Sequence, residues 1–271
     1  MRRSAVPARG PAFARWDWPQ AVCAGPVVHL TGDDEDGLLD GRRRDLLARM
    51  VAECATEPSR GDWARAVCTV CVRAVPRVDG AALTLRSASR AQEMLGASDP
   101  WAARLEEIQY TLGEGPAVEA FTDGGPVLVA DVHVDQVRWP GFAEAGAAAG
   151  VAAVFAFPLQ VGGIRLGTLD LYRRRPGGLS VDAVADAVVL ADVVTLALLQ
   201  HAERSDEDEL RRVISYQDVN MATGMLAAQL RISLEDAFAR LRAHAFATGR
   251  SVLEVSGDVL ARRISLDRLA E

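Results

Sequence analysis

The feature that most constrains the fold is the set of helix start and stop signals near the C-terminus. Ser233 stands three residues before Asp236, and Ser251 stands three residues before Glu254. In each pair the serine can accept a hydrogen bond from a first-turn amide while the carboxylate reaches back to the backbone. Gly249 can adopt the positive φ that ends a helix. These signals predict one helix from Ser233 to Gly249 and another from Ser251.

Apolar residues recur at helical spacing through this region and predict three amphipathic helices. Short helices of this kind are stable only when their apolar stripes are buried against one another, so we expect a three-helix, all-α domain. The stripes are Leu210, Val213, Ile214, Met221, Met225 and Ala228 in the first helix, Leu234, Ala237, Phe238, Leu241 and Ala245 in the second, and Val252, Val255 and Val259 in the third.

The middle of the chain reads as a sheet with helical insertions. The β-rich runs 151–160 and 164–173 flank Gly162 and Gly163, a pair suited to a tight turn, and so predict an antiparallel hairpin. Further strands are expected at 81–86 and 126–130. Helices are expected around Leu46 to Cys54, from an Asp62 cap to Pro76, from Asp99 and Pro100, from Pro116 to Phe121, and from Pro140 to Ala149.

A long helix from Leu179 to His201 follows the hairpin, and its apolar stripe could pair with a second chain. That stripe is Val181, Val184, Val188, Ala191, Thr195 and Leu198. The polar segment 205–209 then joins it to the three-helix region. We therefore expect an α+β fold in three parts: a disordered leader at 1–37, a sensor domain with its exit helix at 38–204, and the output domain at 205–271.

Charge and cysteine usage narrow the function classes. The chain has a net charge of −7, whereas residues 210–271 carry nine arginines against seven acidic residues, so nucleic-acid binding there would depend on placed side chains. Cys23, Cys54, Cys68 and Cys71 have no framework spacing, which favours a reducing cytoplasm. No apolar run is long enough for a membrane span. No catalytic motif is present, so no enzyme activity and no cofactor are expected.

The middle region resembles a GAF domain over roughly residues 39–200. The resemblance is carried by the segment 112–116 (LGEGP), by 129–131 (VAD) with 138–140 (RWP), and by the hairpin strand 164–172 (IRLGTLDLY). It implies an antiparallel sheet flanked by helices that senses a small-molecule or protein signal. Many relatives have a cysteine after GEGP where this chain has Ala117, so thiol sensing at that point is not expected.

The C-terminal region resembles an ANTAR domain through the segments 222–226 (ATGML), 235–238 (EDAF), 241–242 (LR) and 254–255 (EV), together with Ala245. GAF followed by ANTAR is the order of actinobacterial antitermination regulators. The resemblance implies an RNA-binding output that holds a stem-loop and so prevents a terminator from forming. Many relatives have a lysine where this chain has Thr223, which removes one expected phosphate contact.

A candidate RNA surface lies on this output region. RNA loops are recognised by stacking and by hydrogen bonds to base edges, and small residues permit close approach. We expect a flat patch of small residues, side chains that read base edges, and basic residues near phosphates. The candidates are Ala222, Thr223 and Gly224 for the patch, Gln217 and Asn220 for base edges, and Arg231, Arg240, His244 and Arg250 for phosphates. Alternatively Ala222 and Gly224 permit close helix packing and the arginines form a solvated face.

Other candidate sites are weaker. Phe155, Phe157 and Tyr172 could line a ligand pocket in the sensor, or belong to its core. Cys68 and Cys71 are expected to be core cysteines rather than a redox or metal pair. The alternating Asp131, His133 and Asp135 are interpreted as loop caps and surface residues, not as a metal site.

Three other functions are compatible with these patterns. The helices at Ser233 and Ser251 could form a DNA-binding helix-turn-helix, although Glu254 and Asp258 would face phosphates. The protein could be a dimerising signalling module that binds no nucleic acid. It could also be an enzyme built on the GAF fold. The leading hypothesis remains a cytoplasmic, homodimeric, signal-responsive regulator that binds RNA stem-loops.

Overall fold

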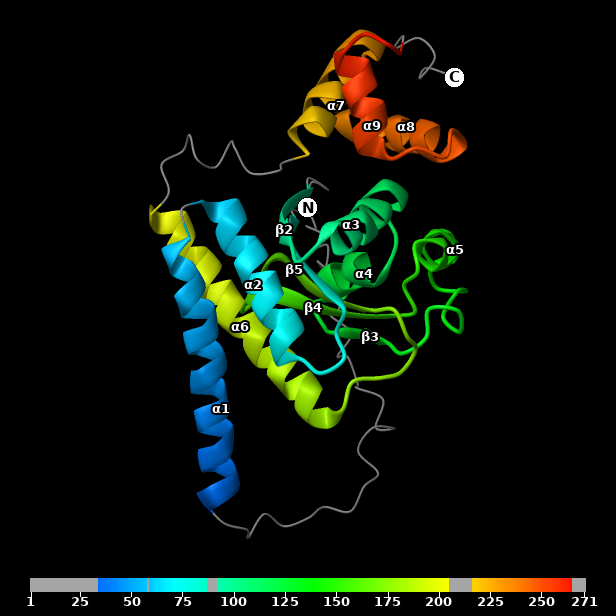
Figure 1. Ribbon diagram of the computed structural model, residues 1–271. Coiled ribbons are helices and arrows are strands. Elements are labelled where there is room, and N and C mark those ends of the chain that lie inside the picture. Colours follow the sequence, from blue (N-terminus) through cyan, green and yellow to red (C-terminus); the bar gives the residue numbers. More distant parts are fainter. Residues whose placement is uncertain (1–33, 58, 87–91, 205–215, 265–271) are drawn as a thin grey trace, which may run out of the picture. The chain divides into compact units, whose positions relative to one another are not determined.

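The computed structural model describes residues 34–57, 59–86, 92–204 and 216–264 (Figure 1). The chain divides into two compact units, Met1–Leu39 and Asp40–Glu271. Most of the predicted leader lies outside the described residues. Its acidic end is helical, however, because α1 (Asp34–Glu53) begins at Asp34 rather than after residue 37.

The centre of the larger unit is a five-stranded antiparallel sheet in the order β2-β1-β5-β4-β3. The predicted hairpin is confirmed, because β4 and β5 pair from Ala153 opposite Arg173 to Val161 opposite Ile164, with Gly162 at φ 56° in the turn. The strands are β1 (Gly80–Arg86), β2 (Gln92–Ala97), β3 (Val127–Val129), β4 (Ala153–Val161) and β5 (Ile164–Arg173). β2 was not predicted.

Helices cover both faces of this sheet (Figure 1). One face packs against α2 (Arg60–Ala74) and α6 (Val181–Arg204) in a core that includes Leu83, Phe155 and Leu169. The opposite face packs against the helices of the GEGP region in a second core. These helices are α3 (Pro100–Leu112), α4 (Pro116–Asp123) and α5 (Pro140–Ala148). The predicted α+β class with a helix-flanked antiparallel sheet is confirmed.

The helix starts follow the expected chemistry, with one correction. Asp99 caps α3 by accepting from the amides of Trp101 and Ala102 at 2.8 and 3.1 Å. The cap of α2 is Ser59, whose hydroxyl accepts from the Asp62 amide at 3.1 Å, so the prediction of Asp62 as the cap was wrong. Asp62 lies in the first turn, where its negative charge interacts favourably with the positive end of the helix dipole.

The buried side of the exit helix α6 matches the predicted stripe only in part, since Ala191, Thr195 and Leu198 of that stripe are buried. Val181 is 86% exposed and Val188 is 38% exposed, whereas Ala183, Ala187, Leu190, Ala191, Val194 and Leu198 are buried. The helix is apolar on more than one side, so periodicity alone does not select the side that packs on β4 and α2. The polar joint at 205–209 lies outside the described residues.

The C-terminal region is the predicted three-helix domain, formed by α7 (Gln217–Leu230), α8 (Leu234–Ala247) and α9 (Val252–Leu260). Val252, Val255 and Val259 are all buried, as expected. The predicted buried stripe of α7 was wrong, because Met221 and Met225 are 52% and 39% exposed. Val219, Ala222 and Leu226 form the buried side instead, and Leu210, Val213 and Ile214 lie outside the described residues.

The caps of the output helices confirm most of the starting prediction. Ser251 accepts from the Glu254 amide at 3.2 Å while the Glu254 carboxylate accepts from the Ser251 amide at 2.9 Å, which is a complete capping box. Ser233 accepts from the Asp236 amide at 3.0 Å. The Asp236 carboxylate, however, accepts from the Ser233 hydroxyl rather than from a backbone amide. Gly249 has φ 65° and ends α8 as predicted.

None of the helices in the described ranges is both long enough and apolar enough to cross a lipid bilayer.

Candidate functional site

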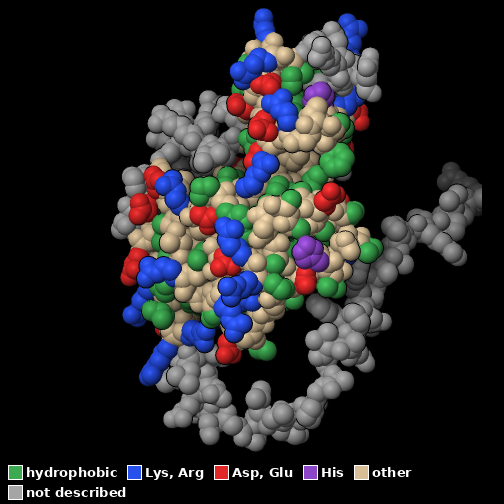
Figure 2. Space-filling model, turned by 45° about the vertical axis from the view of Figure 1, so that its right-hand side comes forward, with side chains coloured by type: hydrophobic (Ala, Val, Ile, Leu, Met, Phe, Trp, Pro, Cys, Tyr) green, Lys and Arg blue, Asp and Glu red, His purple; other side chains and the backbone are tan. Residues whose placement is uncertain are grey.

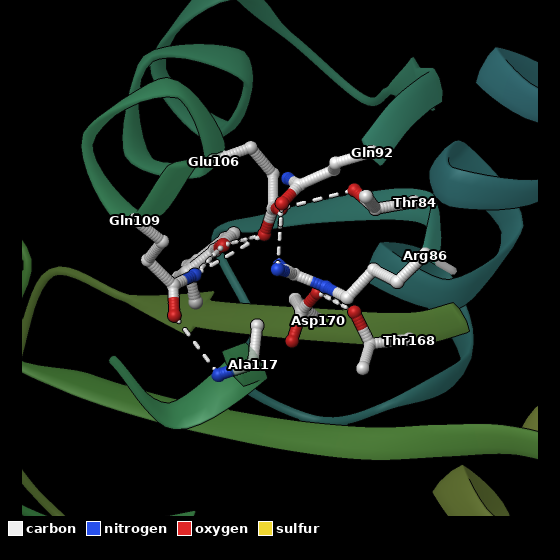
Figure 3. A network of polar contacts seen from close by, with 9 residues as sticks. Thr84, Arg86, Gln92, Glu106, Gln109, Ala117, Thr168 and Asp170 are labelled. Atoms are coloured by element: carbon white, nitrogen blue, oxygen red, sulfur yellow. Dashed lines mark hydrogen bonds and ion pairs between the residues drawn. The ribbon is translucent and has the colours of Figure 1, made fainter. Parts of the chain in front are cut away.

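A buried polar network lies between α3 and the sheet, on the face that also packs against α4 (Figure 3). Its centre is the carboxylate of Glu106, which is completely buried. One carboxylate oxygen accepts from the Thr84 hydroxyl at 3.0 Å and from the Arg86 guanidinium at 3.4 Å. The other accepts from the Tyr172 hydroxyl and from the Gln109 amide, the latter at 3.2 Å. Four donors therefore converge on one buried carboxylate, which compensates for the loss of its hydration.

Gln109 links this network to the start of α4. Its side-chain oxygen accepts from the Ala117 amide at 2.9 Å, and its side-chain nitrogen also donates to the Tyr172 hydroxyl at 3.0 Å. Ala117 lies in the first turn of α4, where backbone amides lack intrahelical partners. The network thus connects α3, α4, β1 and β5 through side chains that are hidden from solvent.

Part of the network has unused hydrogen-bonding capacity. Asp170 is completely buried and accepts from the Thr168 hydroxyl at 2.7 Å through one oxygen, while its other oxygen has no partner among the described residues. Gln92 joins the network by accepting from the Arg86 guanidinium at 2.6 Å. The Arg86 Nε and the Gln92 side-chain nitrogen are likewise buried, with no partner among the described residues. Buried polar atoms are costly when unsatisfied, so these three groups could hydrogen-bond a small polar molecule.

The proposed pocket residues Phe155, Phe157 and Tyr172 do not share one face of the sheet. Tyr172 lies opposite Val154 and packs with α3 and α4, whereas Phe155 and Phe157 lie in the core under α2 and α6. Successive side chains on a strand point to opposite faces, so odd and even positions of β4 separate. A pocket built from all three residues was therefore a wrong prediction, and only Tyr172 belongs to the polar network.

The motif residues 112–116 shape the turn between α3 and α4. Gly113 has φ 66° and Gly115 has φ 133°, both conformations that favour glycine. Glu114 accepts from the Phe142 amide at 3.0 Å and so provides a hydrogen-bond partner for a first-turn amide of α5. Pro116 occupies the first position of α4, where its missing amide costs nothing. The motif thus fixes three helix ends around the buried network.

Two of the weaker predictions concern Asp131 and the paired cysteines. The Asp131 carboxylate accepts from the His133 amide at 2.9 Å, which is the loop cap expected there, and the described residues contain no cluster that could hold a metal ion. Cys68 and Cys71 are completely buried, and burial raises the pKa of the Cys71 thiol to about 12. A thiol with such a pKa stays protonated at neutral pH, in agreement with core cysteines.

The candidate RNA residues of α7 separate into buried and exposed sets. Ala222 is completely buried and Thr223 is 7% exposed, its hydroxyl donating to the Val219 carbonyl at 2.6 Å. The flat surface patch of Ala222, Thr223 and Gly224 is therefore corrected, since only Gly224 is partly open to solvent. Ala222 packs in the core of the three-helix domain, which agrees with the alternative interpretation for that residue. Asn220 is exposed, and the side chain of Gln217 lies outside the described residues.

The basic candidates occupy different settings. Arg231 is exposed and ends α7 in the left-handed conformation, at φ 56°. Arg240 and His244 lie four residues apart on α8, where both are half-buried. Arg250 pairs with Asp258 at 2.7 Å and also donates to the Glu254 carbonyl, so its charge is largely compensated. On the face drawn in Figure 2, arginine side chains are interspersed with acidic ones.

Comparison with known protein families assigns both regions. A model of the GAF domain matches residues 57–199, more than half of the 271 residues, and a model of the ANTAR domain matches residues 210–260. The chain belongs to the GAF domain family and carries an ANTAR domain. This confirms the resemblance inferred from the sequence. GAF domains are sensory and ANTAR domains are RNA-binding antitermination domains, so the arrangement is that of a regulator.

Other comparisons are less informative. No curated protein matches the chain. The chain is similar to the GAF domain of an Acinetobacter phosphoenolpyruvate-protein phosphotransferase, at 14% identity and a TM-score of 0.46, over 61% of this chain and 98% of that one. It is also similar to the free methionine-R-sulfoxide reductase of Neisseria meningitidis, at 15% identity and a TM-score of 0.44, over 65% and 98%. The family match, not these likenesses, establishes the GAF domain.

The buried network of the GAF domain was missed from the sequence, although a signal for it exists. On β5 the residues Thr168, Asp170 and Tyr172 alternate with Leu169 and Leu171. Alternation of polar and apolar residues normally indicates a strand with one face in water. Here helices cover both faces, so the alternation marks a polar cluster inside the domain.

Replacing Asp170 with asparagine is expected to reduce the pH dependence of folding stability. Burial, and then the nearby charge of Glu106, raise the pKa of Asp170 well above its usual range, so the folded state favours the neutral carboxyl. Its contribution to stability is therefore present below the unfolded pKa and is lost as the pH rises towards the folded pKa. Asp170→Asn keeps the neutral form at every pH. Its free energy of unfolding should exceed that of the wild type more at about pH 8 than at about pH 5.

Urea unfolding at both pH values measures this difference. The control is Asp192→Asn, which removes an exposed carboxylate of α6. A gain from Asp170→Asn that is the same at both pH values would contradict the assignment of a neutral buried carboxyl.

Proposed function

We propose that this protein is a signal-responsive, RNA-binding transcription antiterminator of the cytoplasm. In this proposal the GAF domain, within residues 38–204, receives a small-molecule or protein signal, and the ANTAR domain, within 205–271, binds RNA stem-loops. The observation that carries the proposal is the occurrence of an ANTAR domain directly after a GAF domain in one chain. The capped starts of α8 and α9 and the common core of all three helices support a folded output domain.

The RNA surface that we propose consists of the candidate side chains outside the output core. Arg240 and His244 are one helical turn apart on α8, and four-residue spacing places them on the same side of that helix. Asn220, Gly224 and Arg231 add an exposed amide, a small residue and a cation on α7. Because the net charge of the region is only slightly positive, RNA binding by this surface depends on where its side chains lie rather than on the total charge.

The signal site that we propose is the buried network around Asp170 and Arg86. Their unpartnered atoms lie beside the fully occupied carboxylate of Glu106. The Arg86 Nε donates and the neutral Asp170 carboxyl can donate or accept, so a ligand there would need at least one hydrogen-bond acceptor. A small uncharged polar molecule satisfies this requirement better than an ion does, because unpaired charge is expensive in a buried site.

A homodimer through α6 belongs to the same proposal. Val181, Val188, Leu196 and Leu199 are exposed at 86%, 38%, 58% and 38%, and they follow one another at helical spacing. An exposed apolar stripe of this kind commonly marks a protein interface. A partner helix on this side would leave the α2 and sheet contacts of α6 undisturbed.

Removing the positive charge of Arg240 on α8 is expected to weaken stem-loop binding. For the full chain we expect Arg240→Ala to lower the affinity for a hairpin RNA about tenfold at low salt, which corresponds to about 1.4 kcal/mol. Fluorescence anisotropy with a labelled hairpin, an unpaired RNA and a DNA duplex measures the affinity and its specificity. The matched control is Arg263→Ala, which removes an arginine of the same domain that is 69% exposed and pairs with Asp258.

Equal losses in both variants would show that Arg240 has no special position. Tighter binding of duplex DNA than of hairpin RNA would favour the helix-turn-helix alternative. An absence of binding to either nucleic acid would overturn the proposal in favour of a dimerising signalling module.

A further inference from the structure

The last turn of α3 in the GAF domain contacts the ANTAR domain, and both lie within the compact unit Asp40–Glu271. Arg242 of α8 donates to the carbonyl of Thr111 at 2.8 Å and to the carbonyl of Leu112. The last carbonyls of a helix have no intrahelical partner and carry the negative end of its dipole. A cation from the output domain therefore caps a helix of the sensor.

A second contact is aromatic. The rings of Tyr110 on α3 and Tyr216, the residue before α7, stack with a centroid separation of 4.0 Å and an interplanar angle of 19°. Phe238 of α8 lies 5.5 Å from the Tyr110 ring. Both tyrosines are buried, and Tyr110 packs in the hydrophobic cluster of the output domain rather than in either core of the GAF domain. The small three-helix domain thus completes its core with a residue of the sensor.

A third contact involves the start of α9. The amide of Val252 donates to the Thr111 hydroxyl at 3.2 Å. First-turn amides of a helix need an external acceptor, and the Ser251 hydroxyl is already used by Glu254. The same turn of α3 therefore contributes an aromatic ring, two carbonyls and a hydroxyl to contacts with α8, with α9 and with Tyr216, the residue before α7.

Two side chains of the buried polar network also belong to α3. Glu106 and Gln109 lie on the same 13-residue helix as Tyr110, within one turn of it, and their hydrogen-bond partners all belong to the GAF domain. A helix moves as a rigid element, so a displacement at Gln109 moves the capping carbonyls as well. α3 is therefore in contact with both the buried network and the output domain.

Two of the candidate RNA side chains, Arg240 and His244, lie on a different side of α8 from the docking contacts. Phe238 and Arg242 face α3, while Arg240 and His244 are each two residues further along α8. Two residues correspond to about 200° around a helix, so the second pair points away from α3. Docking would therefore act through the position of the output domain rather than by masking Arg240 and His244.

We propose that the last turn of α3, Tyr110–Gly113, is a docking surface for the chain's own ANTAR domain, and that α3 couples this surface to the buried network of Glu106 and Gln109. The docking part stands independently of RNA binding, whereas the coupling part rests on the proposed sensory function. A signal that shifts α3 would change its contacts with Arg242, Tyr216 and Val252 at the same time.

Docking is tested on the full chain by calorimetry and hydrogen exchange. In the wild type we expect one cooperative thermal transition and a protected Val252 amide. Tyr110→Ala and Arg242→Ala are each expected to separate a lower-temperature transition of the output domain and to accelerate exchange at Val252 about tenfold or more. Thr111→Val, which keeps the side-chain volume, should accelerate Val252 exchange without affecting the GAF transition.

The controls are Arg104→Ala, an exposed arginine of α3, and Arg263→Ala in the output domain. They should preserve the single transition and the protection of Val252. Two transitions in the wild type, or unchanged Val252 exchange in both Arg242→Ala and Thr111→Val, would overturn docking. Neither result depends on RNA, so failure here is distinct from failure of the proposed RNA binding.

Coupling is tested by Glu106→Gln, which removes the charge of the network but keeps its shape. Accelerated exchange at Val252 in this variant, with no change in Glu107→Gln, would support coupling through α3. If Val252 exchange responds to Arg242→Ala but not to Glu106→Gln, docking stands and coupling is overturned.

Discussion

Replacing Glu106 with alanine is expected to lower the free energy of unfolding by about 3–5 kcal/mol. The carboxylate accepts from Thr84, Arg86, Gln109 and Tyr172, and every one of these donors would lose a partner in the GAF interior. Unmade hydrogen bonds of buried groups cost more than the bonds themselves contribute. The Arg86 guanidinium, with only 7% of its side chain exposed, would in addition be a buried charge without its counter-ion.

The neighbouring Glu107 provides a matched control on the same helix. It pairs with Arg104 at 3.2 Å at the surface of α3, in a contact of the kind that contributes little to stability. Glu107→Ala is expected to change the free energy of unfolding by about 0.5 kcal/mol or less. Denaturant titration followed by circular dichroism measures both variants. Losses of similar size would show that the network is not the stabilising centre of the domain.

The features that the sequence predicted well are those set by neighbouring residues. The hairpin depends on Gly162 and Gly163 between two β-rich runs, and the start of α3 depends on Asp99 before Pro100. Caps and tight turns are decided within a few residues, so no knowledge of the rest of the fold is required. The same reasoning placed α8 and α9 correctly at Ser233 and Ser251.

Features that depend on distant partners were predicted less well. Met221 and Met225 follow a helical spacing as apolar as that of Val219 and Leu226, and only the packing of α8 and α9 decides which set is buried. β2 was missed because its residues, 92–97, include few β-branched or aromatic side chains. It is a strand because it pairs with β1, which is a tertiary effect.

The candidate sites show the same division. Tyr172 was selected as an aromatic residue near the hairpin, but its partners Glu106 and Gln109 lie more than sixty residues earlier, on a helix whose inward side could not be chosen from spacing alone. The docking contact of Arg242 with α3 spans a still longer separation along the chain. Neither arrangement leaves a local pattern that marks it as a site.

Gly167→Ala is expected to destabilise the GAF domain by about 3 kcal/mol or more. Gly167 lies in β5, paired with Leu85 on one side and Leu159 on the other. A Cβ atom there would overlap the Thr84 carbonyl oxygen and approach the Leu85 Cα to 2.9 Å. Both neighbours are backbone atoms of β1, so the contact cannot be relieved by a side-chain rotation.

The consequence of Gly167→Ala should extend to the buried network. Separation of β1 from β5 would displace Thr84, whose hydroxyl donates to Glu106, relative to Thr168 and Asp170. The control is Gly163→Ala in the adjacent turn, where an added Cβ meets no atom within 4 Å. Thermal and urea unfolding of both variants measure the difference. A Gly167→Ala protein as stable as the Gly163→Ala control would mean that β1 and β5 can separate without cost, which is incompatible with a network that bridges them.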